Sequence, residues 1–202
     1  MDCNLVFEDE IHLNILKKIL AETQPHVTIN RIHQSGSRFY IGKKLFAFNR
    51  ASLIKPHIVL ADLDRIPCVR ILKQKWITFE QSERLFFQVA VREGEAWLLA
   101  DHKSMSTFLG ISLNLLRKEV RQVENIYDPK LLLVNLARRS KRRQIRDGLV
   151  PKGSAKIGDL HNTLLSEYIQ KQWEIEQARI HSSSLNRFLD KLQVFFTSLE
   201  RR

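Results

Sequence analysis

Short apolar runs alternate with segments of helical periodicity through the first half of the chain. The apolar and β-branched runs predict strands at residues 4–7, 26–33, 58–61 and 85–91. Apolar positions that recur at helical spacing predict helices at residues 11–20, 43–53 and 68–76. The run Ile58-Val59-Leu60-Ala61 is apolar throughout, as a parallel strand buried on both faces requires. Strands that alternate with helices predict an α/β fold with a mostly parallel sheet flanked by helices.

After Gly94 the pattern becomes helical, with helices expected at 96–100, 105–109 and 129–146 and a long loop at 149–158. The last helix carries an apolar stripe at Leu185, Phe188, Leu189, Leu192, Phe195, Phe196 and Leu199. We interpret the stripe as packing on the protein's own sheet, with docking of a partner as the alternative. We therefore divide the chain into an α/β core, residues 1–110, and a helical extension that packs on it, residues 111–202.

Composition narrows the class of protein. With 44% hydrophobic residues in 202, the chain can bury a substantial core, which excludes a disordered protein. Its two cysteines, Cys3 and Cys68, are too few for a disulfide framework. The sequence lacks both an apolar run long enough for a bilayer and the basic start of a signal peptide. We expect a cytoplasmic protein that does not associate with membranes.

Acidic residues follow three of the predicted strands. Glu8 follows the first, Asp62 and Asp64 follow the run at 58–61, and Glu93 and Glu95 follow the strand at 85–91. In an open α/β sheet ligands bind outside the carboxyl ends of the strands, so these carboxylates are expected to converge. Carboxylates gathered in this number suit Mg²⁺ or Mn²⁺.

Each of these acids also has a structural explanation. In an extended chain Asp62 and Asp64 project to the same side and face one ion, with Leu63 in the core, whereas a solvated turn would need no ion. Glu8 begins the acidic run Glu8-Asp9-Glu10, which would also stabilise a helix N-terminus. Between Glu93 and Glu95 the spacing does not decide, because a strand would align them and a helix would separate them; we favour Glu95.

Several longer strings resemble a known family. The order strand-Glu-helix followed by strand-Asp-x-Asp resembles the TOPRIM domain of topoisomerases, primases and overcoming-lysogenization-defect-type nucleases. More closely, four strings resemble a bacterial TOPRIM-like family of unknown function: Asn4-Leu-Val-Phe-Glu-Asp-Glu10, Val89-Ala-Val-Arg-Glu-Gly-Glu-Ala-Trp-Leu-Leu-Ala-Asp101, Asp128-Pro-Lys130 and Leu136-Ala-Arg-Arg-Ser140. The similarity covers most of the chain and implies a TOPRIM-like Rossmannoid core.

The resemblance also implies a site and an activity. It makes Glu8, Asp62, Asp64 and an acid from residues 92–95, Glu95 by preference, the catalytic ligands of Mg²⁺ or Mn²⁺. The implied reaction is hydrolysis of phosphodiester bonds in DNA or RNA by two metal ions about 4 Å apart, assisted by a cation such as Arg92 or Lys103. Relatives of this kind are often effectors of anti-phage defence paired with an ABC-type ATPase. In TOPRIM domains the glutamate is usually followed by glycine, whereas in this chain Glu8 is followed by Asp9.

The formal net charge of +11 favours a polyanionic partner, with nucleic acid first. The predicted nucleic-acid-binding residues are Arg92, Arg138, Arg139, Lys141, Arg142, Arg143, Arg146, Lys152 and Lys156. The alternative for the 138–146 cluster is a solvated helix end.

The seven histidines form no pair at metal-binding spacing. The main alternative to a nuclease is a non-catalytic nucleic-acid-binding or partner-docking subunit built on a TOPRIM scaffold; a homo-oligomer is compatible with both.

Overall fold

The computed structural model describes residues 1–201 and divides them into two compact units. The first unit contains residues 1–91 and the chain from Arg187 onward; the second contains residues 92–186. The sequence placed this boundary after residue 110. The difference arises because α4 (Gly94–Ala100), which directly follows the last strand, packs against other helices of the second unit. The C-terminal helix returns to the first unit.

The first unit is built on a four-stranded parallel sheet with the order β2-β1-β3-β4. Its strands are β1 (Asp2–Phe7), β2 (Thr28–Gln34), β3 (His57–Asp62) and β4 (Leu85–Ala90). The predicted α/β class is therefore confirmed, and every pairing is parallel. The chain leaves β1 toward β2 and later crosses back to β3 on the other side of β1. The β1–β3 pair is thus the point at which the strand order reverses, where ligands bind in open α/β sheets.

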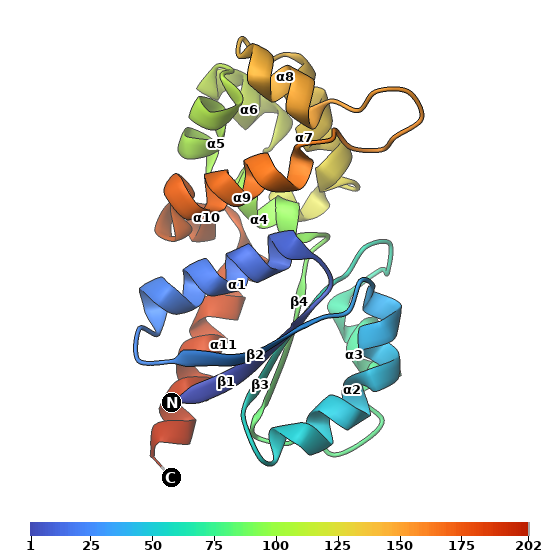
Figure 1. Ribbon diagram of the computed structural model, residues 1–202, viewed down its shortest axis with the longest axis vertical. Coiled ribbons are helices and arrows are strands. Elements are labelled where there is room, and N and C mark those ends of the chain that lie inside the picture. Colours follow the sequence, from blue (N-terminus) through green and yellow to red (C-terminus); the bar gives the residue numbers. More distant parts are fainter. Residues whose placement is uncertain (202) are drawn as a thin grey trace. The chain divides into compact units, whose positions relative to one another are not determined.

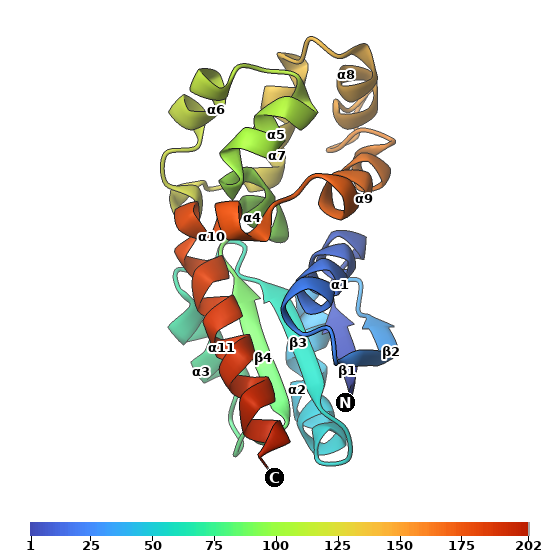
Figure 2. The ribbon, with the colours of Figure 1, turned by 90° about the vertical axis from the view of Figure 1, so that its left-hand side faces the viewer.

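Helices cover both faces of this sheet. Figures 1 and 2 show α1 (Glu10–Thr23) and α11 (Ser183–Glu200) on one face, with α2 (Arg38–Ser52) and α3 (Val69–Trp76) on the other. The fully buried β3 lies between the two helical layers, as its continuous apolar run predicted. The β2 strand is at the edge of the sheet, and most of its residues are exposed.

The apolar stripe of α11 packs on the protein's own sheet. The ring of Phe188 lies 5.3 Å from that of Phe86 on β4, and Leu192 and Phe196 are buried in the first unit. The interpretation that this stripe packs on the protein's own sheet is confirmed. Neither α11 nor any other helix within residues 1–201 is long and apolar enough to cross a membrane.

The second unit is helical. Its α-helices after α4 are α5 (His102–Leu109), α6 (Leu113–Glu119), α7 (Pro129–Arg138), α8 (Arg143–Leu149), α9 (His161–Lys171) and α10 (Ile175–His181). A short 3₁₀ helix, η1, spans Val123–Asn125, and α4 packs against η1, α7 and α10. Trp97 and Trp173 are buried, as expected of core residues.

The prediction of a single helix at 129–146 is wrong, because the helical conformation is interrupted between α7 and α8. At the break the hydroxyl of Ser140 accepts the backbone N–H of Arg142 at 2.9 Å. The N–H of Lys141 donates to the carbonyl of Gly110 at 3.1 Å, outside any helical ladder. A serine side chain that competes for backbone groups in this way interrupts a helix. The loop expected at 149–158 is present between α8 and α9.

Candidate functional site

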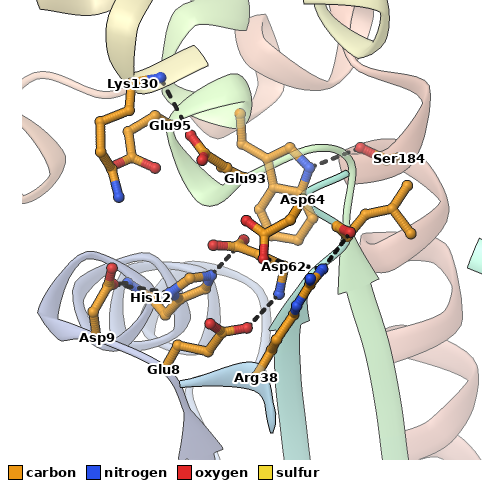
Figure 3. A network of polar contacts seen from close by, with 12 residues as sticks. Glu8, Asp9, His12, Arg38, Asp62, Asp64, Glu93, Glu95, Lys130 and Ser184 are labelled. Carbon is orange, nitrogen blue, oxygen red and sulfur yellow. Dashed lines mark hydrogen bonds and ion pairs between the residues drawn. The ribbon is translucent and has the colours of Figure 1, made fainter. Parts of the chain in front are cut away.

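Glu8 and Asp62 meet at the carboxyl ends of β1 and β3. The Oε1 atom of Glu8 accepts a hydrogen bond from the backbone N–H of Asp62 at 2.7 Å (Figure 3). Burial and the neighbouring charge of Asp62 raise the pKa of Glu8 to about 7, although the N–H bond opposes that shift. The predicted convergence of these two acids is therefore present, and it leaves Glu8 able to exchange a proton near neutral pH.

The buried side chain of His12 lies between Asp9 and Asp62 (Figure 3). Its Nδ1 atom is 2.9 Å from Oδ1 of Asp9, and its Nε2 atom is 2.9 Å from Oδ1 of Asp62. Ionised carboxylates only accept hydrogen bonds, so both ring nitrogens must donate and the imidazole is cationic. Burial disfavours that charge, but the charge of Asp62 and the hydrogen bonds with Asp62 and Asp9 outweigh it and raise the pKa of His12 well above its ordinary value.

The start of α1 brings His12 to this position. Asp9 is the N-cap residue, and its Oδ1 atom accepts the backbone N–H of His12 at 3.1 Å. Because Asp9 directly follows Glu8, the helix begins at the end of β1, and its third residue reaches the end of β3. The expectation that Asp9 belongs to a helix N-terminus is confirmed. Sequence reasoning discounted His12, although a histidine one turn after a capping acid was the available signal.

Asp64 lies in a different environment from Asp62. Its φ of 48° is in the left-handed region, which aspartate tolerates better than most residues. Its Oδ2 atom is 3.0 Å from the guanidinium of Arg38, which also donates to the carbonyl of Leu63 at 2.9 Å. Leu63 is buried as expected, but the extended geometry expected for residues 62–64 is wrong because the chain turns at Asp64. Asp62 pairs with His12 and Asp64 with Arg38, so two different cations hold the two aspartates.

The acids of the 92–95 segment belong to the second unit. Glu93 is the N-cap residue of α4, but its carboxylate accepts the backbone N–H of Lys130, in the first turn of α7, at 3.2 Å. Glu95 is buried within α4, and its Oε1 atom lies 3.3 Å from Nζ of Lys130 and 3.5 Å from Nε2 of His161. Within this unit Glu95 thus pairs with Lys130 and lies near His161, contacts that its sequence environment gave no reason to expect.

The basic residues near the α7–α8 break make separate contacts within the second unit. Arg139 pairs with Glu119 and Arg143 pairs with Asp147, each at 3.2 Å. Arg142 donates to the carbonyl of Phe108 at 3.3 Å, and Arg146 donates to the carbonyl of Ser140 at 2.6 Å. Arg142 and Arg146 thus bind backbone carbonyls within the unit, whereas the exposed pairs of Arg139 and Arg143 are also what a solvated helix end would show. Arg92, also predicted to bind nucleic acid, has its Nε atom buried in the same unit.

Three of the predicted nucleic-acid-binding residues share one hollow. A cavity of about 250 Å³ is lined by Arg138, Arg146 and Lys152, together with Asp147. Arg138 comes from the end of α7, Arg146 from α8, and Lys152 from the loop that follows. The exposed side chains of Lys141 and Lys156 lie outside this lining. Cationic side chains from three elements gathered at one hollow match the chemistry of a phosphate group.

The donor set at Glu8, Asp62 and Asp64 suits a hard divalent cation, because all three side chains offer carboxylate oxygens. The raised pKa of Glu8 shows that burial beside Asp62 disfavours its negative charge, which a cation would relieve. Against this, His12 and Arg38 already supply positive charge to the two aspartates. Within residues 1–201 no group of three His, Cys, Asp or Glu side chains is arranged as a metal site.

No family model matches the chain, and neither a curated protein nor a solved structure is significantly similar to it. The TOPRIM assignment stays a prediction from the four sequence strings. What the fold contributes is the location of Glu8 and Asp62, at adjacent ends of the two strands where ligands bind in sheets of this kind.

Proposed function

We propose that the chain is a Mg²⁺-dependent phosphodiesterase that cleaves DNA or RNA, with Glu8, Asp62 and Asp64 as its metal-binding and catalytic carboxylates. The observation that carries the proposal is the meeting of Glu8 and Asp62 at the β1–β3 switch point, with the pKa of Glu8 raised to about 7. Glu95 and Arg92 belong to the second unit, and their part in catalysis stays a prediction.

The carboxylates have distinct roles in this proposal. A bound Mg²⁺ ion would supply Lewis-acid stabilisation of charge on the phosphate oxygens. Asp62 and Asp64 would offer oxygen ligands, and Glu8, whose carboxylate lies beside Asp62, would accept a proton from the attacking water. His12 and Arg38 hold the aspartates in place before the metal binds.

The second unit would hold the nucleic acid. This role is supported by the hollow at Arg138, Arg146 and Lys152, where three cations can contact the phosphate backbone. Phosphate contacts carry no base information, so they favour neither DNA nor RNA. The wider role, as an anti-phage effector paired with an ABC-type ATPase, rests on the sequence resemblance alone and stays a prediction.

A cleavage assay with matched variants tests the proposal. The purified chain, Asp62→Asn, Glu8→Gln and Glu80→Gln are incubated with plasmid, single-stranded DNA and RNA in Mg²⁺ or Mn²⁺. Glu80 is an exposed carboxylate of the same unit that precedes β4, at the opposite end of the strands, so its variant controls for the change in charge. We expect Asp62→Asn and Glu8→Gln to lose at least about a hundredfold in rate and Glu80→Gln to retain full activity.

Binding of Mn²⁺, followed by isothermal titration, provides a readout independent of turnover. We expect one or two ions to bind the wild-type chain, and Asp62→Asn to weaken that binding while Glu80→Gln does not. Cleavage that persists equally in Asp62→Asn would overturn the assignment of the site. Absence of both cleavage and Mn²⁺ binding in the folded wild-type chain would overturn the proposed activity.

One observation favours the second function, a non-catalytic nucleic-acid-binding subunit. The cationic His12 and Arg38 already balance Asp62 and Asp64, as expected where carboxylates serve to hold a fold together. In that case the carboxylate variants would lose stability without changing nucleic-acid affinity. The same titration separates the two functions, because only the nuclease requires Mn²⁺ at Asp62.

A further inference from the structure

The first unit contains a second hollow, away from the carboxylates. It has a volume of about 680 Å³, within the range of small-molecule sites, and lies between the exposed strand β2 and helix α2. Its lining includes Asn4 near the start of β1 and His57 at the start of β3, whereas Glu8 and Asp62 lie at the ends of those strands. Because α2 packs on β1, β3 and β4, the edge strand contributes exposed side chains to this hollow.

Aromatic rings form one part of the lining. The ring of Phe48 lies 5.3 Å from that of His33 and 6.4 Å from that of His57. The stack of His33 on Tyr40, at 5.8 Å, extends the row beyond the pocket. Ala47 and Ala51 of α2 are exposed and add small apolar surface beside the rings. A row of rings next to small side chains leaves room for a flat aromatic group to stack.

A chain of hydrogen bonds fixes the polar part of the lining. The Nδ1 atom of His57 donates to the carbonyl of Lys55 at 2.7 Å, so its Nε2 atom is left to accept from Nδ2 of Asn4 at 3.3 Å. Burial lowers the pKa of His57, which keeps the imidazole neutral in this arrangement. The Oδ1 atom of Asn4 in turn accepts from Nδ2 of Asn30 at 2.9 Å. The exposed Asn30 amide ends the chain with both donor and acceptor capacity, which suits the edge of a base.

The charged residues of the lining indicate that the ligand is an anion. The pocket is lined by Arg31 and Lys55, and none of its described lining residues is acidic. Lys55 also pairs with Asp2, at 3.2 Å, which lies outside the lining and reduces the contribution of Lys55. Arg31, exposed on β2, is therefore the principal cation, and a guanidinium is well suited to bind a phosphate through paired hydrogen bonds.

We propose that this pocket binds a nucleoside phosphate, with the base against Phe48 and His33 and the phosphate at Arg31. The rings, the amide chain and the cations match the three recognisable parts of such a ligand: a flat base, its polar edge and its anion. The site is separate from Glu8, Asp62 and Asp64, so it gives the protein a nucleotide-binding function that does not depend on metal-dependent cleavage.

Isothermal titration of the full chain in EDTA tests the proposal with AMP, GMP, CMP and UMP as probes, beside adenosine and inorganic phosphate. We expect saturable binding of at least one mononucleotide, tighter than that of adenosine or phosphate alone. Arg31→Ala should weaken it about tenfold or more, while Arg50→Ala, an exposed arginine of α2 outside the lining, leaves it unchanged. Ala51→Trp fills the hollow from an exposed helical position and should abolish binding while keeping the thermal unfolding temperature.

The outcomes separate this proposal from the proposed nuclease. Binding should persist in Asp62→Asn without divalent cations, whether or not the chain cleaves nucleic acid. If a trinucleotide competes with the mononucleotide, the nucleoside phosphate bound in this pocket can come from a nucleic-acid strand as well as from a free nucleotide. The proposal is overturned if no mononucleotide binds the folded chain at concentrations up to about 5 mM. A dissociation constant above that value corresponds to a binding free energy too small for a specific site. It is also overturned if Arg31→Ala and Ala51→Trp both bind normally, or if binding requires Asp62 and Mg²⁺.

Discussion

The strand ends of the first unit and the 138–146 segment of the second unit both carry several charged residues, but the fold brings the acids Glu8 and Asp62 together and gives the neighbouring Arg139 and Arg142 separate partners. Glu8 and Asp62 are 54 positions apart and share a hydrogen bond of 2.7 Å, because neighbouring parallel strands end at the same edge. Arg139 and Arg142 are three positions apart and bind different partners, because the helix breaks between them. Topology, and not density along the chain, concentrates charge at one place.

Removal of His12 should produce the largest effect at the carboxylates. His12→Gln leaves Asp62 and Asp9 without their shared cation, and breaking a buried ion pair costs about 3–5 kcal/mol of unfolding free energy. Arg143→Gln, which removes an exposed ion pair in the basic segment, should cost no more than about 0.5 kcal/mol. Urea unfolding at pH 7 measures both. Similar losses in the two variants would contradict the contrast between the regions.

The pH dependence of stability should isolate Glu8. Its pKa is 4.5 in the unfolded chain and about 7 in the folded chain, so the folded state holds the proton more tightly. The unfolding free energy of the wild type should therefore fall as pH rises from about 4.5 to 7. Glu8→Gln lacks this titration and should be more stable than the wild type at pH 8, by up to about 3 kcal/mol, and equal to it near pH 4.

Mg²⁺ sharpens the same measurement. If the ion binds beside Glu8, it favours the carboxylate and should lower the pKa of Glu8 toward its ordinary value. The difference between wild type and Glu8→Gln at pH 8 should then shrink in Mg²⁺. A difference that Mg²⁺ leaves unchanged would favour the non-catalytic function, in which His12 and Arg38 are the resident cations.

The sequence predicted the sheet well because buried parallel strands leave a direct signal. The apolar run 58–61 became the fully buried β3, and the acids after β1 and β3 fell where parallel strands end. It did not predict that His12 and Arg38 would hold those acids, because both side chains come from helices and the strand-end pattern that placed Glu8 beside Asp62 does not apply to them. The sequence also did not predict the interruption at Ser140. Its neighbours are good helix formers, and a single serine among them does not disturb the helical pattern.

Arg146 offers a smaller test of the basic segment. Its half-buried guanidinium donates to the carbonyl of Ser140 at 2.6 Å and so holds the break between α7 and α8. Arg146→Ala should lower the unfolding free energy by about 1–3 kcal/mol, since a hydrogen bond from a charged group is lost. Arg138→Ala, an exposed neighbour in the same hollow, should change stability by less than about 0.5 kcal/mol. Equal losses in the two variants would contradict the role of the Arg146 hydrogen bond in holding the break.

Lys152 gives the smallest effect on stability and the most specific test of phosphate binding. It is exposed in the loop after α8 and lines the hollow with Arg138 and Arg146. If a phosphate of the nucleic acid occupies that hollow, Lys152→Ala should weaken binding at low salt and reduce the slope of log affinity against log salt by about 1. Lys171→Ala removes an exposed lysine that pairs with Glu167 in the same unit and should leave the slope unchanged. Equal slopes in both variants would mean that Lys152 does not contact a phosphate of the nucleic acid.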